Sequence, residues 1–232
     1  MEPLRVEWRF AAPLALASDY PVHLDALLAW CVMDERERAG SENPWADADD
    51  LSALLERTEP SQPGGDDWCW KASRLNVEWA SDFQYLNMVR KSEPLEFLEG
   101  YDRNLIGGRK RSGINTMSGQ QRGYQWLLPC RWAERAVAYC IGDAQAIEAA
   151  LSRLTHIGKM ARNGFGRVKS VSVEPDEGAS VRWRYRTLPA HEAQQPMPAP
   201  ATLIPVQRPL RAPYWRRLAC VNAVEVLGEG CE

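Results

Sequence analysis

The feature of this chain that most constrains its fold is the order of its apolar patterns. Arg5–Phe10 alternates polar and apolar residues with period 2, which is typical of a half-buried strand. A helical pattern follows over about His23–Arg38, where one apolar stripe is formed by Leu24, Leu27, Leu28, Cys31 and Val32. The chain is therefore expected to open with a strand and an amphipathic helix.

A second helix between strand patterns follows later in the chain. Asp143 has the position of its N-cap, and Ile147, Leu151 and Leu154 form its apolar stripe. Strand patterns lie at Trp68–Phe83 (one or two strands), Trp126–Leu128, Val137–Ile141, Val168–Val173 and Val181–Arg186. This order predicts an α+β fold, a single domain over residues 1–232 with a ferredoxin-like (RRM-like) β-α-β-β-α-β sheet. The open face of such a sheet is a common nucleic-acid platform.

Charge is distributed unevenly along the chain, although the net charge is only −3. Residues 103–217 carry 19 Lys and Arg against 7 Asp and Glu, and the remainder carries 9 against 24. An acidic insertion at about 40–67 is expected either to lie exposed or to cover a sheet edge. Such a chain can offer a basic face to a polyanion, or it can simply have two solvated surfaces of opposite sign.

Residues 100–125 differ in composition from the rest of the chain. They are rich in Gly, Ser, Asn and Gln and too poor in apolar side chains to bury a core, so we expect a long excursion from the sheet that becomes ordered on binding. Its candidate contacts to phosphates and bases are Arg109, Lys110, Arg111, Arg122 and Tyr124. The alternative is a surface loop without a ligand.

A glycine-rich loop precedes the strand at Val168–Val173. Gly158, Gly164 and Gly166 permit positive φ angles and a close backbone approach to a ligand. The side chains between and beside them include candidate contacts to a polyanion, namely Lys159, Arg162, Asn163, Phe165 and Arg167, and free backbone amides could add an anion nest. Because the glycines follow a helix and precede a strand, the loop is neither a Walker loop nor a Rossmann fingerprint. The alternative is a turn that caps a helix.

Two further basic segments have binding and structural interpretations. Arg182, Arg184 and Arg186 would share one face of a strand, either as a stripe that follows a nucleic-acid backbone or as a solvated face. In the C-terminal extension, about 190–232, the segment Tyr214–Arg217 combines aromatic rings with cations, as single-strand binders do, although Trp215 is more typical of a core or subunit contact.

Several classes of protein are disfavoured. No apolar stretch approaches the roughly 18 residues of a membrane span, and the N-terminus has no signal-like run. The six cysteines form no CxxC pair and have no histidines at zinc-ligand spacing, so we expect no metal, no cofactor and reduced thiols in a cytoplasmic protein.

The motifs resemble those of a known group. Gly158-x5-Gly164-Phe165-Gly166, with basic residues among the x positions, resembles the glycine-rich loop of the RAMP superfamily of CRISPR-associated RNA-binding proteins. The segment 23–29 also looks like the opening helix of that superfamily, and this adds His23 to the candidate RNA contacts. Length, the acidic insertion and Pro213-Tyr214-Trp215 are most similar to the type IV effector subunit of the fifth RAMP group.

The resemblance implies a subunit without intrinsic catalysis that holds the 5′ handle of a CRISPR guide RNA, with residues 100–125 as a thumb. Its partners would be guide-backbone RAMP subunits, a large or small effector subunit and, through the complex, target DNA in antiviral defence. One alternative is a metal-independent endoribonuclease that processes the guide precursor with His23 or His156 as base, although a histidine at a helix start is more often structural. Another is a scaffold whose acidic segment docks a basic subunit.

Overall fold

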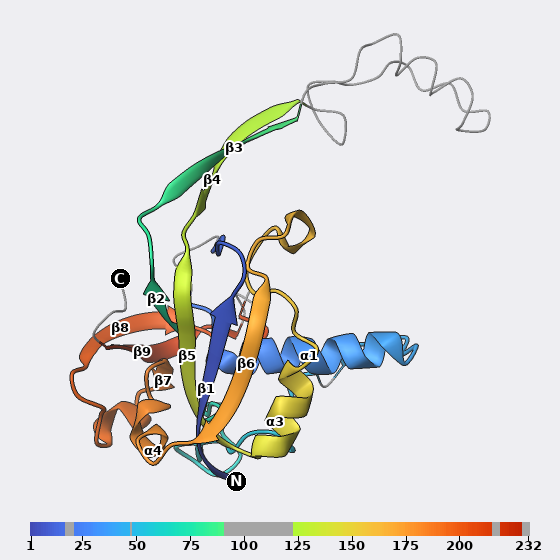
Figure 1. Ribbon diagram of the computed structural model, residues 1–232. Helices are drawn as coiled ribbons and strands as arrows, with labels where there is room; N and C mark the ends of the chain where they lie inside the picture. The colour runs from blue at the N-terminus through green and yellow to red at the C-terminus, as the bar shows by residue number, and fades with distance from the viewer. Residues whose placement is uncertain (17–20, 47, 91–122, 215–218, 229–232) are drawn as a thin grey trace, which may run out of the picture. The chain divides into compact units, whose positions relative to one another are not determined.

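The computed structural model describes residues 1–16, 21–46, 48–90, 123–214 and 219–228 of the chain (Figure 1). The chain divides into two compact units, of which one comprises Met1–Asp82 with Arg131–Glu232 and the other comprises Phe83–Cys130. The larger unit is α+β, with antiparallel sheets and few helices, as the order of apolar patterns predicts.

A four-stranded antiparallel sheet lies at the centre of the larger unit, in the order β2-β5-β1-β6. Its strands are β1 (Glu2–Phe10), β2 (Asn76–Trp79), β5 (Ala133–Gly142) and β6 (Val168–Pro175). The period-2 pattern of β1 is confirmed, because Leu4, Val6 and Trp8 are buried and alternate with more exposed charged residues. The strand expected within Trp68–Phe83 is confirmed only for β2.

Two helices pack on one face of this sheet (Figure 1). The first, α1 (Leu24–Arg38), begins where the sequence predicts and buries Leu24, Leu28 and Cys31 against β1 and β5. The second, α3 (Ala144–Leu151), is capped by the Asp143 carboxylate, which accepts from the Ala146 backbone N–H at 2.8 Å. The predicted N-cap and stripe of α3 are therefore confirmed.

The acidic segment covers part of the sheet edge. Leu51, Leu54 and Leu55 are buried in the main core, and Leu55 forms a bridge with Gly142 at the end of β5. The Asp143 backbone N–H also donates to the Leu54 carbonyl at 3.0 Å. Of the two predicted roles, the structure bears out the edge cover for Leu55 and Glu56, which pair with the last residues of β5 beyond the part that β2 and Lys71–Ser73 occupy.

The predicted strand Val181–Arg186 is wrong. The segment instead begins as a short helix, α4 (Ala179–Arg182), and continues as a turn, since the N–H groups of Arg182 and Trp183 donate to carbonyls four residues earlier. Trp183 lies in a second apolar cluster, and Arg186 is fully buried. The three arginines therefore do not form one strand face. The local alternation could not show that the partners of Arg186 come from distant segments.

The C-terminal extension contains regular structure that the sequence patterns missed. After β7 (Thr187–Pro189) and a short 3-10 helix, η3 (Glu192–Gln194), the chain forms β8 (Thr202–Arg208) and β9 (Val221–Leu227). These strands make an antiparallel sheet in the order β7-β9-β8. Its core is the second apolar cluster, which includes Trp183, Leu188 and Val226. The extension is therefore part of the larger unit.

The smaller unit contains a β-hairpin, in which β3 (Gln84–Arg90) pairs antiparallel with β4 (Tyr124–Cys130). The predicted strand Trp126–Leu128 is confirmed as part of β4. Tyr124 and Gln125, expected in the excursion, are its first two residues, and residues 100–122 lie outside the described chain. Within the described residues, no helix is long and apolar enough to cross a membrane.

Candidate nucleic-acid interface

The glycine-rich loop joins α3 to β6 and is closed by backbone pairing at its base. His156 forms an antiparallel bridge with Arg167, and the Ile157 N–H donates to the Gly166 carbonyl at 2.9 Å. Between them, residues Ala161–Asn163 form a short 3-10 helix, η2. The loop is also held to the segment after β1, because the Lys159 N–H donates to the Ala15 carbonyl at 2.8 Å. The backbone of the loop is therefore held in place by hydrogen bonds, both within the loop and to the chain after β1.

Two of its glycines are required by geometry. Gly166 has a φ of +65°, and a Cβ atom there would lie 1.8 Å from the Ile157 carbonyl oxygen. Gly158 has a φ of +93°, and its Cβ would lie 2.8 Å from the Ala15 carbonyl oxygen. Gly164 also has a positive φ, +87°, but a Cβ there would meet open space. The backbone flexibility predicted for the loop is therefore used to close it on itself and on the chain after β1.

The polar side chains of the loop, unlike its glycines, are available for contacts with a ligand. Lys159, Arg162, Asn163 and Arg167 are exposed, and Phe165 is half-buried. Among the described residues, no carboxylate forms an ion pair with any of the three cations. We call Lys159, Arg162 and Arg167 the loop cations: they are exposed on a turn closed by backbone hydrogen bonds, and no described carboxylate pairs with them. Such cations can neutralise phosphate groups without first breaking an ion pair.

The backbone amides of the loop contribute less than the sequence predicts. Five of them already donate to carbonyl groups within the protein, namely those of Lys159, Asn163, Gly164, Phe165 and Gly166. These amides are not free to form an anion nest, so the prediction of a nest is wrong for them. The capacity of the loop to bind an anion lies in its side chains.

On the face of the central sheet opposite α1 and α3, the described arginines of β1 and β5 form ion pairs. Glu7 accepts ion pairs from Arg5, from Arg9 at 3.1 Å and from Arg135 at 3.6 Å. Arg135 also contacts Glu78 at 2.7 Å. The helix α4 packs on β5 and β1, and Arg182 lies over the Tyr139 ring of β5 at 5.3 Å. The arginines of β1 and β5 therefore balance neighbouring acids.

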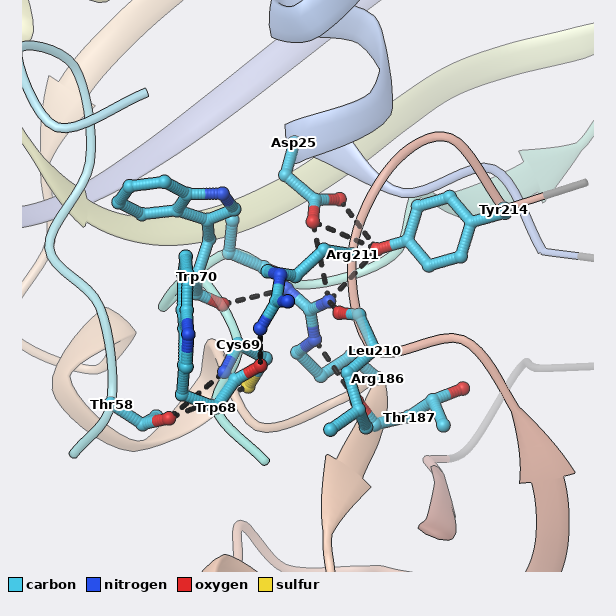
Figure 2. Close-up of polar contacts among 11 residues, drawn as sticks. Asp25, Thr58, Trp68, Cys69, Trp70, Arg186, Thr187, Leu210, Arg211 and Tyr214 are labelled. Atoms are coloured by element: carbon cyan, nitrogen blue, oxygen red, sulfur yellow. Dashed lines mark hydrogen bonds and ion pairs between the residues drawn. The ribbon is translucent and has the colours of Figure 1, made fainter. Parts of the chain in front are cut away.

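Beneath the surface, Arg186 is the centre of a buried polar cluster (Figure 2). Its guanidinium donates to four backbone carbonyls, those of Trp70, Ala72, Thr187 and Leu210, at 2.6–3.1 Å. It also contacts the Asp25 carboxylate at 3.3 Å and the Tyr214 hydroxyl at 2.8 Å. The Tyr214 hydroxyl lies 2.8 Å from an Asp25 oxygen, to which it donates. We call Asp25, Arg186 and Tyr214 the buried clamp.

The clamp joins three parts of the larger unit: the first turn of α1, the turn before β7 and the segment after β8. Burial by itself lowers the pKa of Arg186, but Tyr214 and Asp25 more than offset this and raise it. Burial raises the pKa of Tyr214 well above its ordinary value, so its hydroxyl keeps its proton. A charge-neutral buried pair with these partners holds the fold together, and its polar groups are already satisfied.

His23 belongs to the surroundings of the clamp. It is 3% exposed, it is the N-cap residue of α1, and its ring stacks on Tyr214 with centroids 4.6 Å apart. Burial, together with Arg186, Arg74 and Arg208, lowers its pKa well below the ordinary 6.5. His23 therefore does not lie on the surface with the loop cations. His156, by contrast, is half-buried at the base of the loop and contacts the Thr155 hydroxyl at 3.0 Å.

The other predicted contacts divide between described and undescribed residues. Arg109, Lys110, Arg111 and Arg122 lie outside the described chain, as do Trp215, Arg216 and Arg217. Tyr124 is about half exposed on β4, in a hairpin whose other exposed large apolar residues are Phe83, Tyr85, Leu86, Val89, Trp126 and Leu127. Large aromatic surface of this kind can stack on bases or pack on a protein partner.

Sequence reasoning missed the partners of the buried clamp. Asp25 is an ordinary first-turn acid by position, and Arg186 looked like one of three equivalent strand arginines. A carboxylate two residues after a helix N-cap histidine was the available signal, and it was not specific. No group of three or more potential metal ligands occurs among the described residues.

Comparison with known proteins adds one finding. The family model described as "CRISPR type IV associated protein Csf3" matches residues 2–226 of the chain. A search of curated proteins finds no matching sequence.

Proposed function

Because the chain belongs to the Csf3 family of type IV CRISPR-associated proteins, we propose that it is a non-catalytic RNA-binding subunit that holds the 5′ handle of the guide RNA. The observation that carries this proposal is the cluster of exposed, unpaired loop cations (Lys159, Arg162 and Arg167) on a turn fixed by backbone hydrogen bonds. A pre-organised cationic surface binds a phosphate backbone at low conformational cost.

The topology supports the same assignment. Read along the chain, β1, α1, β2, β5, α3 and β6 follow the order β-α-β-β-α-β, and their strands lie in the sheet as β2-β5-β1-β6. We interpret this as a ferredoxin-like fold of the RAMP type, with the hairpin β3-β4 inserted between its second and third strands. The thumb predicted for residues 100–125 stays a prediction, because residues 100–122 lie outside the described chain.

The proposed partners follow from the family. A type IV CRISPR-associated subunit implies a complex, which we take to contain guide-backbone RAMP subunits, a large or small effector subunit and target DNA, in the cytoplasm. The apolar and aromatic residues exposed on β3 and β4 are candidates for such contacts, since a two-stranded hairpin is marginally stable without something packed on it.

A salt titration with a matched pair of variants tests the proposal. In the first variant, the loop cations Lys159, Arg162 and Arg167 are changed to Gln; in the control, Arg5, Arg9 and Arg135 of the sheet face are changed to Gln. Both variants lose three positive charges. Because each phosphate contact to a single strand adds about 0.7 to the slope of log K against log salt, the loop variant should lower the magnitude of the slope by about 2.

The loop variant should also weaken binding of handle RNA by at least about tenfold, whereas the control should retain most of the affinity. If both variants lost the same affinity for handle RNA, the loss would be due only to the change in net charge. An unchanged affinity in the loop variant would refute the proposed role of the loop.

The endoribonuclease alternative is tested separately by incubating repeat RNA with the protein in EDTA. We expect no cleavage, because the His23 ring is enclosed by Tyr214 and does not reach the surface with the loop cations. A single cleavage that is lost in His156→Ala or His23→Ala would overturn the non-catalytic assignment.

A further inference from the structure

A pocket of about 190 Å³ lies on the side of the central sheet that carries α4, away from α1 and α3. Its lining includes Ser73, Arg74 and Asn76 from the segment that leads into β2, Tyr139 from β5, Arg182 from α4 and Tyr185. None of the lining residues belongs to the glycine-rich loop. The pocket is therefore a site separate from the one that carries the proposed function.

The charge of this pocket favours an anion. Among the described residues, two arginines line it and no aspartate or glutamate does. Arg182 lies along the Tyr139 side chain, with its Nη1 3.5 Å from the Tyr139 hydroxyl, and its nearest carboxylate, Asp176, is 3.9 Å away. An ion pair at that distance with a half-exposed arginine leaves the guanidinium available to a second anion.

Arg74 adds a second, independent observation. Its side chain is 8% exposed, and its Nη2 has no hydrogen-bond partner within the described part of the chain. Its other terminal nitrogen is 3.6 Å from the Glu225 carboxylate, which Arg208 also approaches to 2.7 Å. One carboxylate thus faces two guanidinium groups, and a buried guanidinium nitrogen without a partner is unfavourable. An anion in the pocket would be attracted by the charge of Arg74, which belongs to its lining.

The size and the walls of the pocket limit what the anion can be. A dry cavity of 150 Å³ holds one benzene-sized ring, and pockets for drug-sized ligands are larger, at about 300–1,000 Å³. A volume of about 190 Å³ therefore suits one phosphate or one ring. Tyr139 and Tyr185 add aromatic side chains to the lining, and Asn76 adds an amide that can donate and accept.

We propose that this pocket binds the phosphate of a single nucleotide unit, with Arg74 and Arg182 as its cationic ligands and the tyrosine rings beside the sugar or base. The nucleotide can be free in solution or part of an RNA strand, since both present the same phosphate and ring. The inference does not depend on the guide-holding function, because it rests on other elements of the fold.

Titration of the full-length protein with 5′-AMP, adenosine and inorganic phosphate at constant ionic strength tests the proposal by calorimetry. 5′-AMP should bind at least tenfold more tightly than adenosine, and inorganic phosphate should compete with it. Arg182→Gln should weaken 5′-AMP binding at least tenfold, and because this side chain is about half exposed the variant should fold. Arg135→Gln, which removes a paired arginine on the same sheet face, is the matched control and should bind normally.

Equal binding of adenosine and 5′-AMP would overturn the proposal, as would normal binding by Arg182→Gln or an equal loss in Arg135→Gln. A short single-stranded RNA identifies the source of the nucleotide: displacement of 5′-AMP assigns the pocket to an RNA strand, and simultaneous binding assigns it to a free nucleotide. If the pocket binds no nucleotide while the loop variant still loses RNA affinity, only this inference fails and the proposed function stands.

Discussion

The buried clamp and the glycine-rich loop use the same side chain in opposite surroundings. Arg186 is fully buried, donates to four backbone carbonyls and contacts the Asp25 carboxylate. Arg162 is exposed, and no described carboxylate pairs with it. Removing a guanidinium from water is costly unless its hydrogen bonds and its charge are both compensated, and only the clamp provides that compensation.

The difference separates two roles that arginine has in this protein. A buried arginine whose hydrogen bonds are all satisfied holds the segments that it contacts in place. Its removal should therefore lower the free energy of unfolding. An exposed arginine without an ion-pair partner stays hydrated, and its charge remains available to a ligand. Its removal should therefore lower the affinity for that ligand. The predictions that follow test whether the two regions divide in this way.

The largest expected effect is the loss of the clamp cation. Arg186→Met removes one partner of a buried ion pair and leaves the buried Asp25 carboxylate without its cation, so the free energy of unfolding should fall by about 3–5 kcal/mol in a urea titration. Tyr214→Phe, which keeps the ring and the charge pair but loses the hydroxyl, should cost less, about 1–3 kcal/mol. A loss under about 1 kcal/mol in Arg186→Met would contradict the role of the clamp.

Within the loop, two glycines should respond differently to the same change. Gly166→Ala places a methyl group 1.8 Å from the Ile157 carbonyl oxygen at a positive φ, so it should destabilise the protein by about 2–5 kcal/mol. Gly164 also has a positive φ, but a Cβ atom there would meet open space. Gly164→Ala should therefore lower the free energy of unfolding by only about 1–2 kcal/mol. Thermal unfolding of the two variants measures the difference. Equal losses would mean that the loop is not closed as described.

A smaller effect is expected in the pH dependence of stability. Burial and the nearby arginines lower the pKa of His23 below 6.5, so the unfolded chain binds this proton more readily than the folded chain does. Stability is therefore complete above about pH 6.5 and falls as the pH decreases, by up to about 1.4 kcal/mol per pH unit.

His23→Phe keeps a ring against Tyr214 and removes the proton site. Urea titrations of both proteins at pH 7.5 and 5.5 should show a larger loss for the wild type than for the variant, since the remaining groups titrate in both. The same loss in both proteins would show that His23 is not held in its neutral form.

The smallest stability effect should come from the loop cations. Changing Lys159, Arg162 and Arg167 to Gln should alter the free energy of unfolding by no more than about 0.5 kcal/mol, because these side chains are exposed and have no ion-pair partner among the described residues. Circular dichroism during urea unfolding checks this. A loss of several kcal/mol would assign the cations to the fold and would weaken the comparison with the clamp.

The elements that could be predicted from the sequence are those with a local cause. The period-2 pattern places β1, the apolar stripe places α1, and Asp143 caps α3 through the N–H of Ala146, three residues later. The same reasoning was wrong for Val181–Arg186, where a regular alternation occurs in a short helix and a turn. There the burial of Trp183 and Arg186 depends on residues far along the chain, which a local pattern cannot contain.

The candidate site likewise has features that could be predicted from nearby residues and features that could not. The glycines and cations of the loop are close in sequence, so their common position between a helix and a strand could be predicted. The hydrogen bonds of the Lys159 and Gly166 amides to the chain after β1, and the pairing of Arg135 with Glu7 and Glu78, depend on contacts between separate segments. For that reason the anion nest and the open-face platform were expected where the structure shows amides and arginines already occupied.

By itself, the sequence determined the α+β class, the first strand, the two main helices and the position of a basic glycine-rich loop. These follow from side-chain periodicity and capping, which act over a few residues. Only the tertiary structure decided which of the described arginines are paired with a carboxylate and which are exposed without such a pair. Arg186 is joined to Asp25, 161 positions away, whereas Arg162 has no described acid beside it. Pairing a charge is a matter of distance in space, and distances between remote segments are set only when the chain has folded around its core.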